Sequence, residues 1–230
     1  MEAVSKTLRS IKESAEQSKR KCYRCRADSD VQVCGPCVNR QMEQSLETTG
    51  IPLGLYKPSW EIPEWAKKYT ESPRGLFLHG AAGVGKSATC ALLLREKVRS
   101  VFASWDGNYT GHEVSEYLFI SYPMFIMRLQ DAYIRGETDK TAYRMIQAAA
   151  SAKVLVIDDL GAEKLTDFVR QSTYALINER EQWRRTTYIT SNWSVRQIAD
   201  QIDVRVASRI VGLCDVLEMK GKDRRAERDD

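Results

Sequence analysis

Apolar residues fall into short runs from Arg74 onward, and stretches with helical spacing separate these runs. Each run has the length and the β-branched or aromatic content of a buried strand. Alternating strands and helices are typical of a parallel sheet with helical crossovers, so the pattern predicts an α/β domain over residues 72–230. The expected strands lie in GLFLHG (75–80), EYLFISY (116–122), KVLVIDD (153–159), RTTYITSN (185–192) and CDVLEMK (214–220).

The first 71 residues have a different texture. Val4, Leu8 and Ile11 form one stripe of a short amphipathic helix within residues 1–20. A cysteine cluster without hydrophobic periodicity follows, and prolines recur from Pro52 to Pro73, which excludes a long helix there. The chain therefore divides into an N-terminal helix and cysteine module (1–45), a proline-rich connector (46–71) and the α/β domain (72–230).

Composition and charge limit the compartment and the partners that we expect, but they do not indicate a function. The chain has 230 residues, a hydrophobic content of 43% and a net charge of +4, which permits nucleic-acid binding but does not argue for it. We see no apolar run that approaches the ~20 residues needed to span a bilayer. The charged N-terminus also lacks the apolar core of a signal peptide, so we expect a cytoplasmic protein with no membrane partner.

The segment GAAGVGKS fits the pattern of a phosphate-binding loop, or P-loop. It follows a strand-like run and opens a helix, which makes a chance match of a glycine-rich turn the weaker reading. Lys86 would reach the β- and γ-phosphates of ATP, and the Ser87 hydroxyl would hold Mg²⁺. The residues expected to bind ATP are Gly80, Ala81, Ala82, Gly83, Val84, Gly85, Lys86, Ser87 and Ala88.

Two adjacent carboxylates end the third predicted strand of the domain, where they would repel each other unless something positive met them. Asp158 falls where P-loop proteins place the Walker B aspartate, so it is expected to bind Mg²⁺. Asp159 would orient and deprotonate the attacking water. A solvated strand-end turn is the alternative interpretation, and the neighbouring P-loop argues against it.

Polar residues also end the strand Thr186–Asn192. In P-loop ATPases with an additional strand, this strand lies between the P-loop and Walker B strands and places a polar side chain near the γ-phosphate. Asn192 is the candidate sensor, with Thr190 and Ser191 as alternatives. Asn192 could instead cap the helix that follows.

Arginines cluster near the end of the chain. Arg205 and Arg209 are four residues apart, on one face of a predicted helix. Arg224 and Arg225 follow the last predicted strand. An arginine that faces a neighbouring subunit's γ-phosphate stabilises charge in the transition state, although each of these arginines could equally be a solvated surface charge.

The segments GLFLHGAAGVGKS, VLVIDDLGAEK, YITSNWS and RVASRI, in this order, resemble AAA+ helicase loaders of the DnaC/DnaI type. The transposition helper IstB belongs to the same family. The connector TGIPLGLYKPSW (49–60) resembles the family's G-I-P segment, and MKGKDRR (219–225) resembles its closing strand and sensor 2 stretch. The resemblance covers roughly residues 50–225.

This resemblance implies an ATPase that uses Mg²⁺, with Asp159 as its catalytic carboxylate. It further implies sensor 1 at Asn192, an arginine finger at Arg209 with Arg205 as the alternative, and sensor 2 at Arg225. Many relatives carry glutamate at the position of Asp159, so slow hydrolysis is expected. The gap between the G-I-P segment and the P-loop is short, which leaves the adenine side of the nucleotide to be covered differently.

Two C-x-x-C pairs, Cys22/Cys25 and Cys34/Cys37, supply four thiolates from two turns. This pattern predicts a structural, tetrahedral Zn²⁺ site. The segment CGPC also resembles a thioredoxin active site, but that interpretation leaves the second pair unexplained.

The leading hypothesis is an ATP-dependent loader that places a replicative DnaB-type helicase on single-stranded DNA. ATP would drive its self-association into a ring or spiral. A transposase-helper ATPase that selects target DNA is the alternative, and an adaptor that binds nucleotide without turnover is a third. A zinc module at the N-terminus favours the loader, because transposition helpers of this family generally lack one.

Overall fold

The computed structural model describes residues 20–22, 24–29, 33–55, 59–103, 115–135 and 141–224. The predicted helix within residues 1–20 lies almost wholly outside these ranges. The strands are β1 (Arg20–Lys21), β2 (Asp28–Ser29), β3 (Gly75–His79), β4 (Tyr117–Ser121), β5 (Val154–Asp158), β6 (Thr186–Ser191) and β7 (Cys214–Glu218). The α-helices are α2 (Gly35–Thr48), α3 (Lys86–Ala103), α5 (Tyr122–Ile134), α6 (Thr141–Ser151), α7 (Asp167–Gln182), α8 (Val195–Gln201) and α9 (Val204–Leu213), with 3₁₀ helices η1 (Leu53–Leu55) and η2 (Glu64–Thr70).

Five parallel strands form the main sheet, in the order β4-β5-β6-β3-β7. The predicted strands and the parallel α/β architecture are therefore confirmed. Strand β6 lies between the P-loop strand β3 and the Walker B strand β5, as in P-loop ATPases with an additional strand. The carboxyl ends of β3, β5 and β6 consequently meet at one edge of the sheet, and this edge carries the candidate site.

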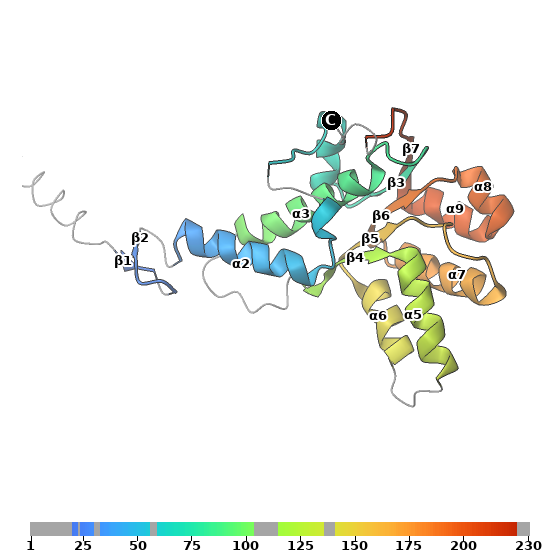
Figure 1. Cartoon of the computed structure of the whole chain (residues 1–230), viewed down its shortest axis with the longest axis horizontal. Helices are drawn as coiled ribbons and strands as arrows, with labels where there is room; N and C mark the ends of the chain where they lie inside the picture. The colour runs from blue at the N-terminus through green and yellow to red at the C-terminus, as the bar shows by residue number, and fades with distance from the viewer. Residues whose placement is uncertain are drawn as a thin grey trace, which may run out of the picture.

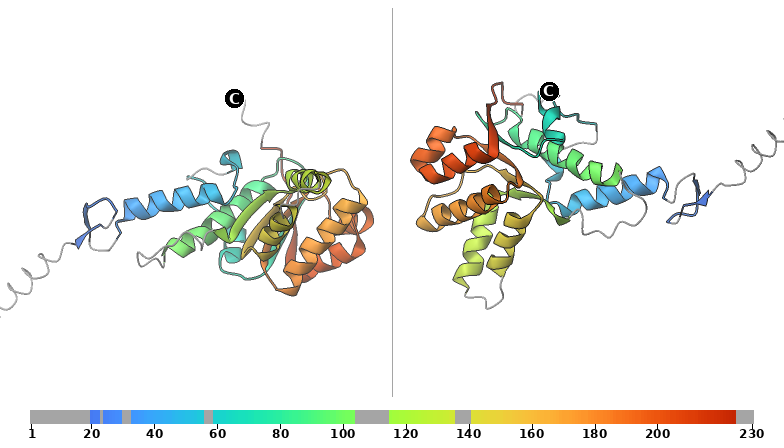
Figure 2. Two further views of the ribbon diagram at one scale, coloured as in Figure 1. Left: turned by 90° about the horizontal axis from the view of Figure 1, so that it is seen from below. Right: turned by 180° about the vertical axis from the view of Figure 1, so that it is seen from behind.

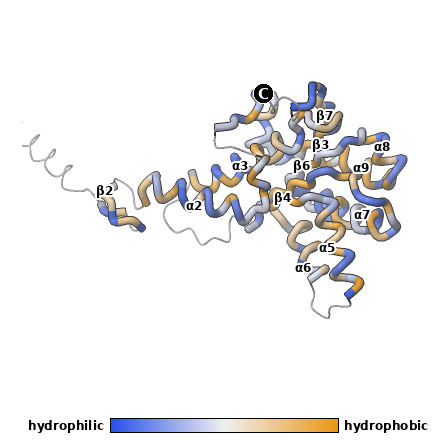
Figure 3. Tube along the Cα trace, viewed as in Figure 1, coloured by the Kyte–Doolittle hydropathy of each residue, from blue (hydrophilic) through white to orange (hydrophobic). Residues whose placement is uncertain are grey.

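Helices cover both faces of this sheet (Figure 1). Phe77, Leu155 and Ile157 point into a core shared with α5 to α9, whereas Leu76 and Leu78 point into a core shared with α3 and the connector. Because successive side chains of a strand point to opposite faces, an unbroken apolar run is what a doubly covered sheet requires. Figure 3 shows the outer turns around α8 as mostly hydrophilic. Within the described ranges, the helices are all too short or too polar to cross a membrane.

Helix α2 joins the cysteine cluster to the sheet. It packs along α3, the helix that begins at the P-loop, as both views in Figure 2 show. The predicted boundary at residue 45 falls inside this helix. Just beyond it, the Thr49 carbonyl accepts a hydrogen bond of 2.7 Å from the Phe119 N–H on the edge strand β4. The N-terminal module is thus held to the sheet by a helix and by a backbone contact.

A fully buried arginine fastens α6 and β6 from within the core. The Arg180 guanidinium donates to the carbonyls of Ala149, Ala150, Ala152 and Thr186, and its Nε donates to the Thr187 hydroxyl at 2.8 Å. Burial lowers its pKa to about 9, so it stays protonated at neutral pH. The charge is accommodated because carbonyl dipoles at the carboxyl end of α6 converge on it.

Arg180→Met is expected to lower the free energy of unfolding by about 3 kcal/mol, because buried carbonyls lose their donors. Chemical denaturation followed by circular dichroism measures this change. Arg184→Met is the matched control, because Arg184 is exposed and close in sequence. Equal stability of the two variants would show that the Arg180 bonds contribute no net stability.

Candidate nucleotide-binding site and cysteine cluster

The P-loop runs from the end of β3 to the start of α3, and glycine is required at three of its positions. Gly80, Gly83 and Gly85 have φ angles of +138°, +76° and +102°, which side chains rarely adopt. The C-terminal tail also lies directly against the loop. A Cβ at Gly80 would collide with the Met219 carbonyl, and one at Gly83 would collide with the Asp223 carboxylate.

Lys86 has a buried side chain whose ammonium is held by two segments of the site. It donates to the carbonyls of Gly80 at 2.8 Å and Ala81 at 2.7 Å, and to the Asn192 Oδ1 at 2.9 Å. The carboxyl end of β6 is thereby tied to the P-loop. A positive charge held by neutral oxygens favours a phosphate placed beside it.

The Thr190 hydroxyl organises the two adjacent aspartates. It donates to the Asp158 Oδ1 at 2.7 Å and accepts the Asp159 N–H at 2.9 Å. Burial raises the pKa of Asp158, while hydrogen bonds from Ser87 and Thr190 oppose this rise. Asp159 has a φ of +61°, in the left-handed region that residues other than glycine rarely adopt. Asp158 is hydrogen-bonded to Ser87, and Asp159 lines the cleft above the P-loop.

A cleft of about 650 Å³ lies over the P-loop. Its volume is within the range typical of sites for small ligands. The connector, the P-loop, the start of α3, the end of β6 and the C-terminal tail all contribute to its walls. The lining residues are Gly54, Leu55, Ser59, Trp60, Glu61, Pro63, Ala82, Gly83, Gly85, Lys86, Ser87, Ala88, Thr89, Leu92, Asp159, Asn192 and Arg224.

The structure brings most of the residues predicted from the sequence to this cleft. Asn192 contacts Lys86, whereas the alternative Ser191 uses its hydroxyl to bind the Leu160 carbonyl at 2.6 Å. Arg225 lies outside the described residues. Its neighbour Arg224 lines the cleft, and the Arg224 N–H donates to the Gly83 carbonyl at 3.1 Å. The resemblance assigned sensor 2 to Arg225, and the residue that the structure places at the loop is its neighbour Arg224.

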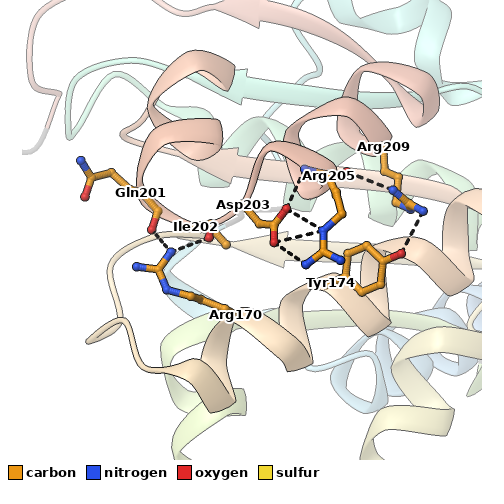
Figure 4. Close-up of polar contacts among 7 residues, drawn as sticks. All are labelled: Arg170, Tyr174, Gln201, Ile202, Asp203, Arg205 and Arg209. Carbon is orange, nitrogen blue, oxygen red and sulfur yellow. Dashed lines mark hydrogen bonds and ion pairs between the residues drawn. The ribbon is translucent and has the colours of Figure 1, made fainter.

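Arg205 and Arg209 lie away from the cleft lining, on α9 (Figure 4). Both guanidinium carbons lie 4.7 Å from the centre of the Tyr174 ring, so the two cations converge on one aromatic side chain. Arg205 is exposed and paired with Asp203, whose pKa this contact lowers to about 2. Arg209 is half-buried and donates to the Asn178 Oδ1 at 2.7 Å and the Tyr174 hydroxyl at 3.0 Å.

The sulfur atoms of Cys22, Cys25, Cys34 and Cys37 all lie within 4.8 Å of one another. Sulfur atoms of a tetrahedral Zn²⁺ site are about 3.8 Å apart, given Zn–S bonds of about 2.3 Å. Arg24 and Arg40 line a hollow beside Cys25 and Cys37. Their positive charges suit a zinc tetrathiolate, which carries a net negative charge. The donor set and its surroundings therefore fit zinc.

No protein-family model matches the chain. Among curated proteins, it is similar to the replicative helicase loader DnaI of Bacillus subtilis (strain 168). The two are 23% identical over 179 residues, which cover 71% of this chain and 52% of the relative. The chain thus spans about half the length of the curated relative that it matches.

Several solved structures have a similar fold. The crystal structure of the DnaC helicase loader matches with a TM-score of 0.54 at 24% identity, covering 76% of this chain and 99% of that one. The crystal structure of DnaI matches with a TM-score of 0.56 at 21% identity, covering 76% and 93%. AMPPCP-bound DnaA from Aquifex aeolicus matches with a TM-score of 0.52 at 17% identity, covering 68% and 44%.

Proposed function

We propose that the chain binds Mg²⁺–ATP in the P-loop cleft and hydrolyses it. The observation that carries this proposal is the convergence of Lys86, Asp159 and Asn192 on one cleft. Asp159 and Asn192 both lie more than seventy residues after the P-loop in the sequence. Their side chains would nevertheless stand where the γ-phosphate of a bound ATP would lie. The same fold holds an ATP analogue in a DnaA structure, which supports ATP as the ligand.

Each residue has a role that follows from its position. Lys86 would exchange its carbonyl partners for the β- and γ-phosphates, and Gly80–Ala88 would cradle the phosphates with backbone N–H groups. Ser87 and Asp158 would hold Mg²⁺, which neutralises phosphate charge. Asp159 would orient and deprotonate the water, and Asn192 would sense the γ-phosphate. Arg224 or Arg225 would serve as sensor 2.

Lys86→Ala should abolish tight ATP binding, because the buried ammonium is lost. Asp159→Asn should retain ATP binding and lose hydrolysis, because the amide keeps the shape but is not a base. Asp159→Glu should hydrolyse faster if the short side chain makes the wild-type site slow. Calorimetric titration and a phosphate-release assay measure both properties. Turnover at the wild-type rate by Asp159→Asn would remove Asp159 as the base.

We further propose that this ATPase loads a replicative DnaB-type helicase onto single-stranded DNA. A loader is favoured over a transposase helper because the curated relative and two of the similar structures are helicase loaders. The cysteine module, bound to zinc, would contact the helicase. Co-purification with the host's helicase tests this role, and loss of the interaction on removing residues 1–33 is the expected result. That truncation stops before α2, which packs on α3.

The wild-type chain should carry about one zinc ion, bound by the four cysteines. Cys25→Ser should lose the metal, because three thiolates hold zinc less well, and should still bind ATP at the distant P-loop. Mass spectrometry of purified protein under reducing conditions measures the metal content. Cys90→Ala is the control, because Cys90 is a buried thiol of α3 outside the cluster and should leave zinc in place. Wild-type protein free of stoichiometric metal would contradict the zinc site.

Assembly should complete the active site, with Arg209 of one subunit reaching the γ-phosphate held by the next. The hydrogen bonds that Arg209 donates to Asn178 and Tyr174 would then orient its guanidinium. Arg209→Ala should bind nucleotide but lose ATP-dependent assembly and hydrolysis. Mixing it with Lys86→Ala should restore part of the activity, because one interface in the mixture pairs an intact Lys86 with an intact Arg209.

The ATPase rate of the mixture and of each variant alone measures this complementation. The same experiment with Arg205→Ala tests the alternative finger. A wild-type rate for Arg209→Ala alone, with no recovery in any mixture, would transfer the role to Arg205.

A further inference from the structure

One wall of the cleft comes from the connector, and a buried arginine holds it. Trp60, Leu55 and Pro63 belong to the lining of the cleft. The Arg95 side chain is almost fully buried on α3, and its NH2 donates to the Trp60 carbonyl at 2.9 Å. Its Nε donates to the Glu96 carboxylate at 3.1 Å. Arg95 therefore spans 35 residues of sequence to fix the backbone of an aromatic residue in the cleft wall.

Helix α3 connects this contact to the P-loop. Ser87, Thr89 and Leu92 line the floor of the cleft, and Arg95 follows Leu92 by one helical turn. On neighbouring turns, this helix thus carries Leu92, which lines the cleft, and Arg95, which binds the Trp60 carbonyl. The Trp60 carbonyl is thereby hydrogen-bonded to the helix that begins at the P-loop.

We propose that Trp60 is the stacking wall for the nucleobase and that Arg95 is the positioning residue that holds it there. The proposal rests on the proposed function, because it concerns the ligand of the same cleft. An indole beside Leu55, Pro63 and Leu92 offers the base an apolar face, and stacking favours the larger purine ring over a pyrimidine. The short connector thereby covers the base with its own aromatic residue.

Inorganic tripolyphosphate separates base recognition from phosphate recognition, because it offers three phosphates and no base. Calorimetry with Mg²⁺ should show that Trp60→Ala weakens ATP binding by about tenfold or more and leaves tripolyphosphate binding unchanged. Trp60→Phe keeps an aromatic ring and should retain most of the ATP affinity. Trp65→Ala is the matched control, because Trp65 lies in the same connector, is partly exposed and is absent from the cleft lining.

The Arg95 role has its own test. Arg95→Met keeps the aliphatic volume but removes the donor to the Trp60 carbonyl, so it should weaken ATP binding several-fold with tripolyphosphate binding unchanged. Arg95→Lys keeps one donor and should recover part of the loss. In addition, ATP should change the tryptophan fluorescence of the wild type and of Trp65→Phe, but not that of Trp60→Phe.

The outcomes are distinguishable. Equal losses for ATP and tripolyphosphate in Trp60→Ala would make Trp60 a general structural residue and overturn the proposal. Unchanged ATP affinity in Trp60→Ala would overturn it as well. Unchanged ATP affinity in Arg95→Met would remove Arg95 as the positioning residue. If the wild type binds neither ATP nor tripolyphosphate, the nucleotide site itself is rejected.

Discussion

The buried ammonium of Lys86 is the constraint on which the candidate site depends. A charge in the interior must be met by oxygen atoms, and here the P-loop carbonyls and the Asn192 amide supply them. This requirement draws the carboxyl end of β6 against the loop after β3. Strand β6 also pairs with β5, which places Thr190 where its hydroxyl holds both aspartates. The order of the strands thus brings the polar groups of the site together.

Segments from both ends of the described chain meet at this loop. The connector forms one wall of the cleft, and it follows directly from α2 and the cysteine cluster. The tail after β7 lies against the loop itself, with Met219, Asp223 and Arg224 beside the three loop glycines. A whole nucleotide bound in the cleft would therefore contact or displace parts of both segments. Under the proposed function, this gives ATP a physical means of affecting the N-terminal module.

Much of this architecture could be predicted from the sequence, because the strongest signals are local. Unbroken apolar runs predict doubly covered strands, and GAAGVGKS fixes the position of the phosphate loop between β3 and α3. The spacing of the four cysteines likewise predicts that they form one cluster. The comparisons then confirm the resemblance to DnaC/DnaI-type loaders that the ordered motifs indicate.

The features that sequence analysis missed depend on contacts between distant residues. Arg180 and Arg95 look like surface charges in the sequence, yet tertiary packing buries both. Thr190 was a possible sensor, and only the pairing of β5 with β6 shows that its hydroxyl joins the two aspartates. The choice between Arg224 and Arg225 depends on the path of the tail. The tail after β7 is irregular, so the sequence carries no helical or strand periodicity that would show which of two adjacent arginines faces the loop.

Hydrogen exchange of the full chain, with and without Mg²⁺–ATP, tests most directly whether the P-loop is the meeting point of these segments. Bound nucleotide is predicted to slow amide exchange at Gly80–Ala88, at the connector around Leu55 and Trp60, and in the tail from Met219 to Arg224. Protection restricted to other parts of the sheet, with these three segments unchanged, would contradict the account.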